Sequence, residues 1–215
     1  MDNGIFDPFP AGFNYNKEYK SATCIVHPGY SIYSAGGRNA RDDIGKYGSY
    51  NTYLDNLLEL VKRQRSLGEL TILAVEQDVL SMPKLEEKLS VICPFDISLV
   101  IATDASSMIH DSFSEKVLVN GKSIKQDINF IYNLLQSYGI TELRFAGEYV
   151  WYLKYENNEE GPGCVPTAAL IFQREGFSIK GVKECVFPLK APPTKKNSEI
   201  GEIKEKLYGD AISVL

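Results

Sequence analysis

The sequence predicts an α/β fold, a three-layer, Rossmann-like sandwich with a mainly parallel central sheet and helices on both faces. The first observation is that short apolar runs typical of strands alternate with longer amphipathic segments typical of helices. The second is that helices used as crossovers make the strands they join run parallel. The third is the strand segment 22–27, which opens with small or apolar residues on both faces and therefore belongs in the sheet interior.

The composition fits one globular domain. The chain has 215 residues, of which 44% are hydrophobic, enough to bury a sizeable core. Its net charge of -5 argues against the basic surface that nucleic-acid binding needs, so we expect a small-molecule ligand or a protein partner. No apolar run approaches the roughly 18 residues that span a bilayer, and no signal-peptide pattern opens the chain. We therefore expect a cytoplasmic protein without a membrane partner.

The chain divides into three predicted parts. Residues 1–20, rich in Asn, Phe, Pro and Gly, show no sustained hydrophobic period and are expected to form an N-terminal arm. Residues 21–190 form the α/β domain. Residues 191–215 contain a linker and a polar helix at 198–208, which we expect to pack on the same domain.

The first half of the domain begins with strand 22–27 and continues into a long segment, 30–50, rich in Gly, Ser, Tyr and Arg. Loops of this length are usually functional or mobile. Residues 51–67 are predicted as a helix that ends at Gly68. Its apolar residues recur at i, i+3, i+4 and i+7, namely Leu54, Leu57, Leu58 and Val61. A second strand follows at 70–75.

In the second half of the domain, the patterns that predict helices and strands are weaker at the start. Residues 76–89 are expected to form a loop and a short charged helix, and of the strand-like runs 90–94 and 97–102 only one need belong to the central sheet. The next predicted elements are a strand at 117–120, a helix at 124–138 with an apolar stripe, and a strand at 143–146.

A turn, a helix and a strand then follow one another in the stretch 161–187. Gly161 and Gly163 flank Pro162 and allow a sharp turn, and Gly176 ends the helix. Cys164 lies where the turn becomes the helix. The N–H groups and the macrodipole at a helix N-terminus favour a thiolate and can hold a substrate's carbonyl oxygen, so Cys164 is the candidate nucleophile. The alternative is an inert core cysteine, a common role for this residue type.

Polar residues that follow predicted strands mark where a ligand would bind, because ligands of parallel α/β sheets bind beyond the carboxyl ends of the strands. These residues are His27, Glu76, Asn120, Lys122, Glu148 and Cys164.

Patterns typical of cofactor or metal sites are not found. Gly121-Lys122-Ser123 lacks the earlier glycine of a phosphate-binding loop, since position 116 is Lys, and no Gly-x-Gly-x-x-Gly follows the first strand. The other cysteines, Cys24, Cys93 and Cys185, form no Cys-x-x-Cys pair, and the chain has only two histidines. We therefore expect neither a cofactor nor a metal.

The stretch 139–187 resembles the isochorismatase-like cysteine hydrolases, the family that includes the nicotinamidases. The resemblance rests on Cys164-Val165-Pro166-Thr167-Ala168 and on Gly176-Phe177 after the helix. It implies the isochorismatase-like form of the Rossmann-like fold and a cysteine hydrolase activity. This chain departs from the family in the 16 residues of segment 148–163, where the family has only a few. We expect this insertion to lie over the carboxyl edge of the sheet.

The family's mechanism uses an Asp after the first strand, a Lys after a middle strand, and the Cys. At the corresponding positions this chain has His27 and Asn120, with Lys122 two residues later. His27 suits a base at neutral pH by its ordinary pKa near 6.5, or is a satisfied polar residue at a strand end. Lys122 is the candidate for the positive charge that Asn120 does not supply.

Two functions remain open from the sequence. One is a cysteine hydrolase of small-molecule amides or esters, in which Cys164 attacks a carbonyl and His27 or Lys122 manages the proton. The other is a catalytically silent protein of the same fold with a binding or assembly role. Tyrosines concentrate in 30–53 and 149–155, where they would wall a pocket or form a homo-oligomer interface.

Overall fold

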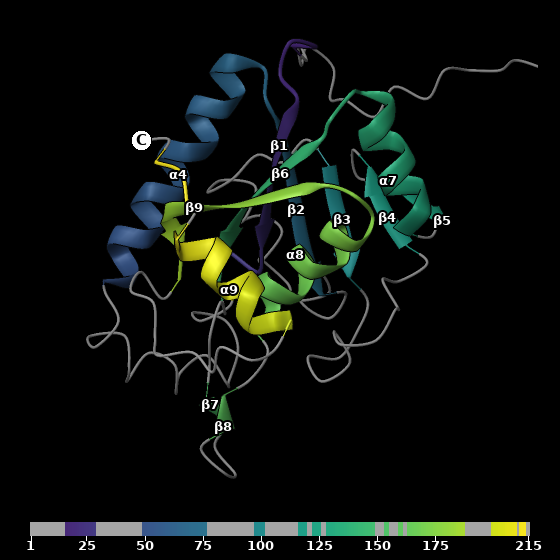
Figure 1. The fold of residues 1–215 in the computed structure, drawn as a ribbon. Helices are drawn as coiled ribbons and strands as arrows, with labels where there is room; N and C mark the ends of the chain where they lie inside the picture. The colour runs from purple at the N-terminus through teal and green to yellow at the C-terminus, as the bar shows by residue number, and fades with distance from the viewer. Residues whose placement is uncertain are drawn as a thin grey trace, which may run out of the picture.

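The computed structural model describes residues 16–28, 49–76, 97–101, 116–119, 122–125, 128–148, 153–154, 159–160, 163–187, 199–209 and 211–213. Figure 1 shows their elements, which in chain order are β1 (Ser21–Val26), α4 (Tyr50–Leu67), β2 (Leu70–Glu76), β3 (Ile97–Ile101), β4 (Lys116–Val119), β5 (Lys122–Lys125), α7 (Ile128–Ser137), β6 (Glu142–Gly147), β7 (Leu153–Lys154), β8 (Glu159–Glu160), α8 (Cys164–Arg174), β9 (Ser178–Val186) and α9 (Glu199–Gly209).

The central sheet has seven strands in the order β5-β4-β3-β2-β1-β6-β9. Strands β3, β2, β1, β6 and β9 run parallel to one another, whereas β4 pairs antiparallel with both β3 and β5. β1 lies inside the sheet between β2 and β6, and all six of its residues are buried. The predicted α/β fold with a mainly parallel sheet and an interior first strand is therefore confirmed.

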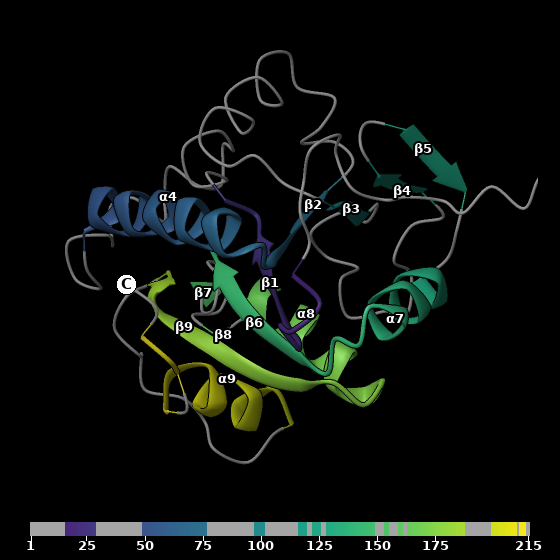
Figure 2. The ribbon, with the colours of Figure 1, turned by 90° about the horizontal axis from the view of Figure 1, so that it is seen from above.

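Helices cover both faces of this sheet, as Figure 2 shows from above. One apolar cluster packs α4 against the sheet and includes Ile25, Leu57 and Leu60. The other packs α7, α8 and α9 against the opposite face and includes Ile131, Phe172 and Leu207. Of the helices within the described ranges, none has the length and apolar character needed to cross a membrane.

Helix α4 begins and ends where the sequence signals predict. The Ser49 side chain accepts a hydrogen bond from the Thr52 N–H at the first turn, and Gly68 ends the helix at a φ of 72°. The helix runs one residue further toward the N-terminus than predicted, which brings Tyr50 onto its buried face. Tyr50 lies seven residues before Leu57, so the two share that face.

The region after β4 differs from the prediction. Residues 122–125 form strand β5, paired antiparallel with β4, and α7 begins only at Ile128. Ile124 is the first residue of the predicted helix, but in the structure it pairs with Val117 across the hairpin. The backbone hydrogen bonds of this hairpin replace those of the first predicted helical turn, which explains the later start of α7.

Several predictions fall outside the described residues. These are the arm at 1–15, the segment 30–48, the loop, short helix and strand expected over 77–94 with Cys93, Asn120, and most of the 148–163 insertion.

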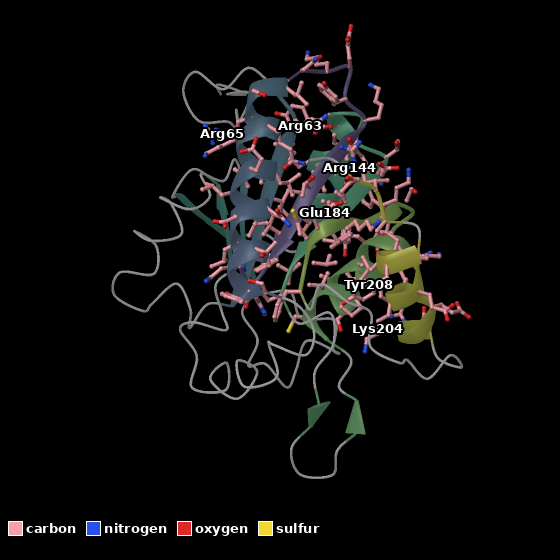
Figure 3. The ribbon with its side chains drawn as sticks, turned by 90° about the vertical axis from the view of Figure 1, so that its left-hand side faces the viewer. Arg63, Arg65, Arg144, Glu184, Lys204 and Tyr208 are labelled. Atoms are coloured by element: carbon pink, nitrogen blue, oxygen red, sulfur yellow. The ribbon has the colours of Figure 1, made fainter. Side chains whose placement is uncertain are left out.

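Helix α9 lies against β9 and α8, and Leu207 is fully buried between them. Burial raises the pKa of Tyr208 on the same helix, and Figure 3 shows Lys204 and Tyr208 extending from it. Beyond the helix, Ile212 exchanges backbone hydrogen bonds with β9, donating to Gly181 at 2.9 Å and accepting from Lys183 at 3.1 Å. The C-terminal residues thus extend the sheet beyond its edge strand.

Gly181→Ala is expected to displace α9, because a Cβ at this position would lie 1.9 Å from the Leu207 carbonyl oxygen. We expect a cost of about 2 kcal/mol, the usual scale of overpacking. Limited trypsin digestion measures the effect as faster cleavage after Lys204, which is 3% exposed in the intact fold. Gly209→Ala is the control, since a Cβ there meets nothing within 4 Å, and equal cleavage of the two variants would contradict the prediction.

A polar network crosses the strands at the amino end of the sheet. Arg144 on β6 binds Glu69 at 3.0 Å and Glu142 at 3.2 Å, and Lys180 on β9 binds Glu142 at 2.8 Å. Partial burial raises the pKa of Glu142, but its hydrogen bonds to Lys180 and Arg144 outweigh this and leave the pKa below its usual range. Figure 3 shows Arg144 toward the same end as Arg63 and Arg65 of α4.

Candidate active site

The carboxyl edge of the parallel strands is formed by the ends of β1 and β6 and the starts of α4 and α8. Each of these helices follows a strand and returns antiparallel to it, so both helix N-termini lie at this edge. Val26 and Gly147, the last residues of β1 and β6, are partners in the register. The residues that follow them, His27 and Glu148, therefore both lie at this edge.

Cys164 is the first residue of α8, as the sequence predicts, and it follows a glycine in an unusual backbone conformation. Gly163 has a φ of 81° and ψ of 143°, a conformation that favours glycine. The Gly163 carbonyl accepts the Thr167 N–H at 3.2 Å and the Thr167 hydroxyl at 2.6 Å, which closes the first helical turn. Pro166 has no N–H, so the backbone N–H groups at the start of α8, before that of Thr167, are those of Cys164 and Val165.

The thiols of this chain differ in burial. Cys24 on β1 and Cys185 on β9 are fully buried, and burial raises the pKa of Cys24 to about 12. Cys164 is partly exposed, although its side chain also packs against the apolar cluster on the α8 side. Among the cysteines in the described ranges, Cys164 is therefore the one that is not fully buried.

His27 lies directly after β1 and is 2% exposed. Its φ is 51°, and it is the only non-glycine residue with a positive φ within the described ranges. Its N–H donates to the Ala74 carbonyl of β2 at 2.9 Å. Burial lowers the pKa of His27 to about 4, whereas a base with an ordinary pKa was one of the two roles that the sequence left open for it. The imidazole is thus neutral at pH 7 and, by roughly a hundredfold, a weaker base than a solvated histidine.

Glu148 and Tyr50 form the polar contact at this edge that the sequence did not identify. Glu148 is fully buried, its N–H donates to the Val26 carbonyl at 2.9 Å, and its Oε1 accepts from the Tyr50 hydroxyl at 2.5 Å. The place of Glu148 after a strand was visible in the sequence, but its partner was not, because Tyr50 is 98 residues away. The available signal for Tyr50 was its helical spacing from Leu57.

Lys122 is not brought to this edge. Because β4 runs antiparallel to β3 and pairs Val119 with Lys122, the start of β5 lies toward the amino end of the parallel strands. Three strands separate β5 from β1, which corresponds to roughly 19 Å across the sheet. Glu76 is the last residue of β2, and Asn120 lies outside the described residues. The catalytic roles suggested for Lys122 and Asn120 remain predictions.

The insertion hairpin and possible metal ligands are the remaining features relevant to this edge. The β7–β8 hairpin of the insertion lies beyond the same end of the sheet in Figure 1, as expected for the insertion. Within the described ranges, no group of three His, Cys, Asp or Glu residues is placed to share a metal ion.

Comparison with solved structures gives likenesses, whereas the other comparisons give none. No family model matches the chain, and no curated protein matches it. The crystal structure of N-carbamoylsarcosine amidase from Thermoplasma acidophilum is similar to this chain, with 11% sequence identity over 89% of this chain and 94% of that chain and a TM-score of 0.45. The α/β fold is established by the strand order and pairing of this chain itself.

Proposed function

We propose that this protein is a cysteine hydrolase of small-molecule amides or esters, with Cys164 as the nucleophile. The observation that carries the proposal is the position of Cys164, partly exposed on the first residue of α8 at the carboxyl edge of a parallel sheet. A ligand of such a sheet binds at this edge, and the helix N-terminus favours negative charge there. The resemblance of 164–168 to the nucleophile segment of isochorismatase-like hydrolases supports the same assignment.

The proposed reaction has two steps. The Cys164 sulfur bonds to the substrate's carbonyl carbon while the thiol proton passes, through a group at this edge, to the departing amine or alcohol. The backbone N–H groups of Cys164 and Val165 receive the negative charge on the carbonyl oxygen. Water then adds to the thioester carbon, the carbon–sulfur bond breaks, and a proton returns to Cys164. His27 is the proposed proton carrier in preference to Lys122, because the strand of Lys122 starts toward the opposite end of the sheet.

The test is a search for the covalent intermediate. The protein is mixed with a panel of small activated esters and amides, quenched with acid, and its mass measured intact and after digestion. We expect an acyl group on the peptide that contains Cys164, a parallel release of product, and neither in Cys164→Ala. Product release by Cys164→Ala at the wild-type rate would overturn the assignment of the nucleophile.

Alkylation is expected to select Cys164 among the thiols of the structure. With limiting iodoacetamide at pH 7.5, Cys164 should react at least tenfold faster than Cys24, whose pKa of about 12 leaves almost no thiolate. Peptide mapping measures both rates, and Cys185, also fully buried, is a second internal reference. A Cys93→Ser background removes the thiol outside the described residues. Equal labelling of Cys24 and Cys164 would contradict the prediction.

A catalytically silent binding protein of the same fold is the second candidate, and the burial of His27 favours it. A histidine with a pKa of about 4 removes a thiol proton far less readily than one near 6.5. The two candidates predict different results in the ester panel. A silent protein would show selective alkylation of Cys164 but neither an acyl adduct nor product release.

A further inference from the structure

The positive φ of His27 requires support from its surroundings. A β-carbon crowds the backbone in the left-handed region, and a non-glycine residue stays there only when neighbouring contacts hold it. The conformation is confined to His27 among the described non-glycine residues, and it occurs at the edge where Cys164 lies. The contacts that hold His27 therefore affect the candidate site.

The peptide between Val26 and His27 is fixed on both sides by neighbouring strands. Its carbonyl, that of Val26, accepts the Glu148 N–H at 2.9 Å, and its N–H, that of His27, donates to the Ala74 carbonyl at 2.9 Å. The first bond comes from the end of β6 and the second from β2. The orientation of this peptide, and with it the φ of His27, thus depends on where Glu148 is held.

Glu148 is in turn held by α4. Its carboxyl accepts a hydrogen bond from the Tyr50 hydroxyl at 2.5 Å, and both side chains are buried. The Tyr50 ring packs edge-on against Phe187 with centroids 5.2 Å apart and against Tyr53 at 5.5 Å. The Phe187 N–H donates to the Gly147 carbonyl at 2.8 Å, so the same ring cluster is tied back to the end of β6.

We propose that Tyr50 and Glu148 are a positioning pair that holds His27 in its buried, left-handed conformation beside the candidate site. Tyr50 anchors the Glu148 carboxyl, and Glu148 anchors the peptide that precedes the His27 α-carbon. The pair acts on His27 and not on a substrate. The consequence for hydrolysis rests on the proposed function, whereas the conformation and environment of His27 can be measured without any turnover.

Tyr50→Phe is the central variant because it keeps the ring and removes the hydroxyl. The imidazole of His27 is followed by NMR over pH 3.5 to 8 in the full chain with selectively labelled histidine. In the wild type we expect the pKa of about 4 that burial gives His27. In Tyr50→Phe we expect the peptide between Val26 and His27 to be released and the His27 imidazole to reach solvent. The pKa of His27 should then rise by at least one unit toward 6.5. Glu148→Ala should give the same rise and serves if Tyr50→Phe does not fold.

Two controls separate positioning from other effects. Tyr53→Phe removes a hydroxyl from the same helix and ring cluster and should leave the His27 titration as in the wild type. Glu148→Gln keeps an oxygen that accepts the Tyr50 hydroxyl but does not titrate, and it too should show no rise. Among the described residues, the titratable ones near β1 at this edge are Glu148 after β6, Glu76 at the end of β2, Tyr50 on α4 and Cys164 at the start of α8.

The possible results are distinct. A rise in Tyr50→Phe and Glu148→Ala without a rise in the two controls supports the proposal. A pKa that stays near 4 in both Tyr50→Phe and Glu148→Ala overturns it, as does a rise of equal size in Glu148→Gln or Tyr53→Phe. None of these results depends on whether Cys164 forms an acyl adduct, so failure of the hydrolase proposal remains distinguishable.

Discussion

Gly147→Ala is expected to destabilise the fold by about 4 kcal/mol, because two costs coincide at this position. Gly147 has a φ of 123°, where an L side chain is strained, and a Cβ would lie 2.0 Å from the Val26 carbonyl oxygen and 2.6 Å from the Val26 nitrogen. Conformational strain contributes roughly 1–2 kcal/mol and overpacking roughly 1–3 kcal/mol. Val26 cannot move aside, because its carbonyl is bonded to Glu148 in the middle of the sheet.

Urea unfolding measures this effect, and Gly176→Ala is the matched control. Gly176 also has a positive φ, 89°, but a Cβ there meets nothing within 4 Å. We expect Gly176→Ala to cost about 1 kcal/mol, the strain alone. The difference between the two variants then isolates the contact with Val26. A difference below roughly 1 kcal/mol would mean that the β1 and β6 ends are further apart than the structure shows.

Features set by local sequence were predictable. The burial of β1 followed from small and apolar residues on both faces, and the ends of α4 followed from Ser49 and Gly68. The turn before Cys164 followed from the glycine at 163, since its φ of 81° is one that other residues rarely adopt. In each case the residue type and its immediate neighbours determine the conformation, so no tertiary contact had to be known.

Features set by distant contacts were not predictable. Ile124 fits a helical stripe and a hairpin equally well, and only its pairing with Val117 decides between them. The antiparallel pairing of β4 with β3 places Lys122 toward the opposite end of the sheet from Cys164. Likewise, the hydrogen bond between Tyr50 and Glu148 joins two elements with no shared pattern. The low pKa of His27 arises from burial by the assembled sheet, which a single residue at a strand end does not reveal.

The burial of His27 predicts that the protein loses stability in mild acid. The folded pKa of about 4 lies below the unfolded value near 6.5, so the unfolded state binds more protons between these two values. The contribution of His27 is therefore fully present above pH 6.5 and is lost as the pH falls toward 4. A difference of roughly 2.5 pKa units corresponds to roughly 3 kcal/mol. Urea unfolding at intervals from pH 7 to pH 4 measures the loss.

His27→Asn isolates this contribution, because Asn does not titrate and tolerates the left-handed backbone that His27 adopts. Carboxyl groups such as Glu142, whose pKa is also lowered, change the stability of both proteins alike and cancel in the comparison. We expect the stability of the wild type minus that of His27→Asn to fall by roughly 3 kcal/mol between pH 7 and pH 4. A difference that stays constant over this range would show that His27 is already solvated in the folded protein.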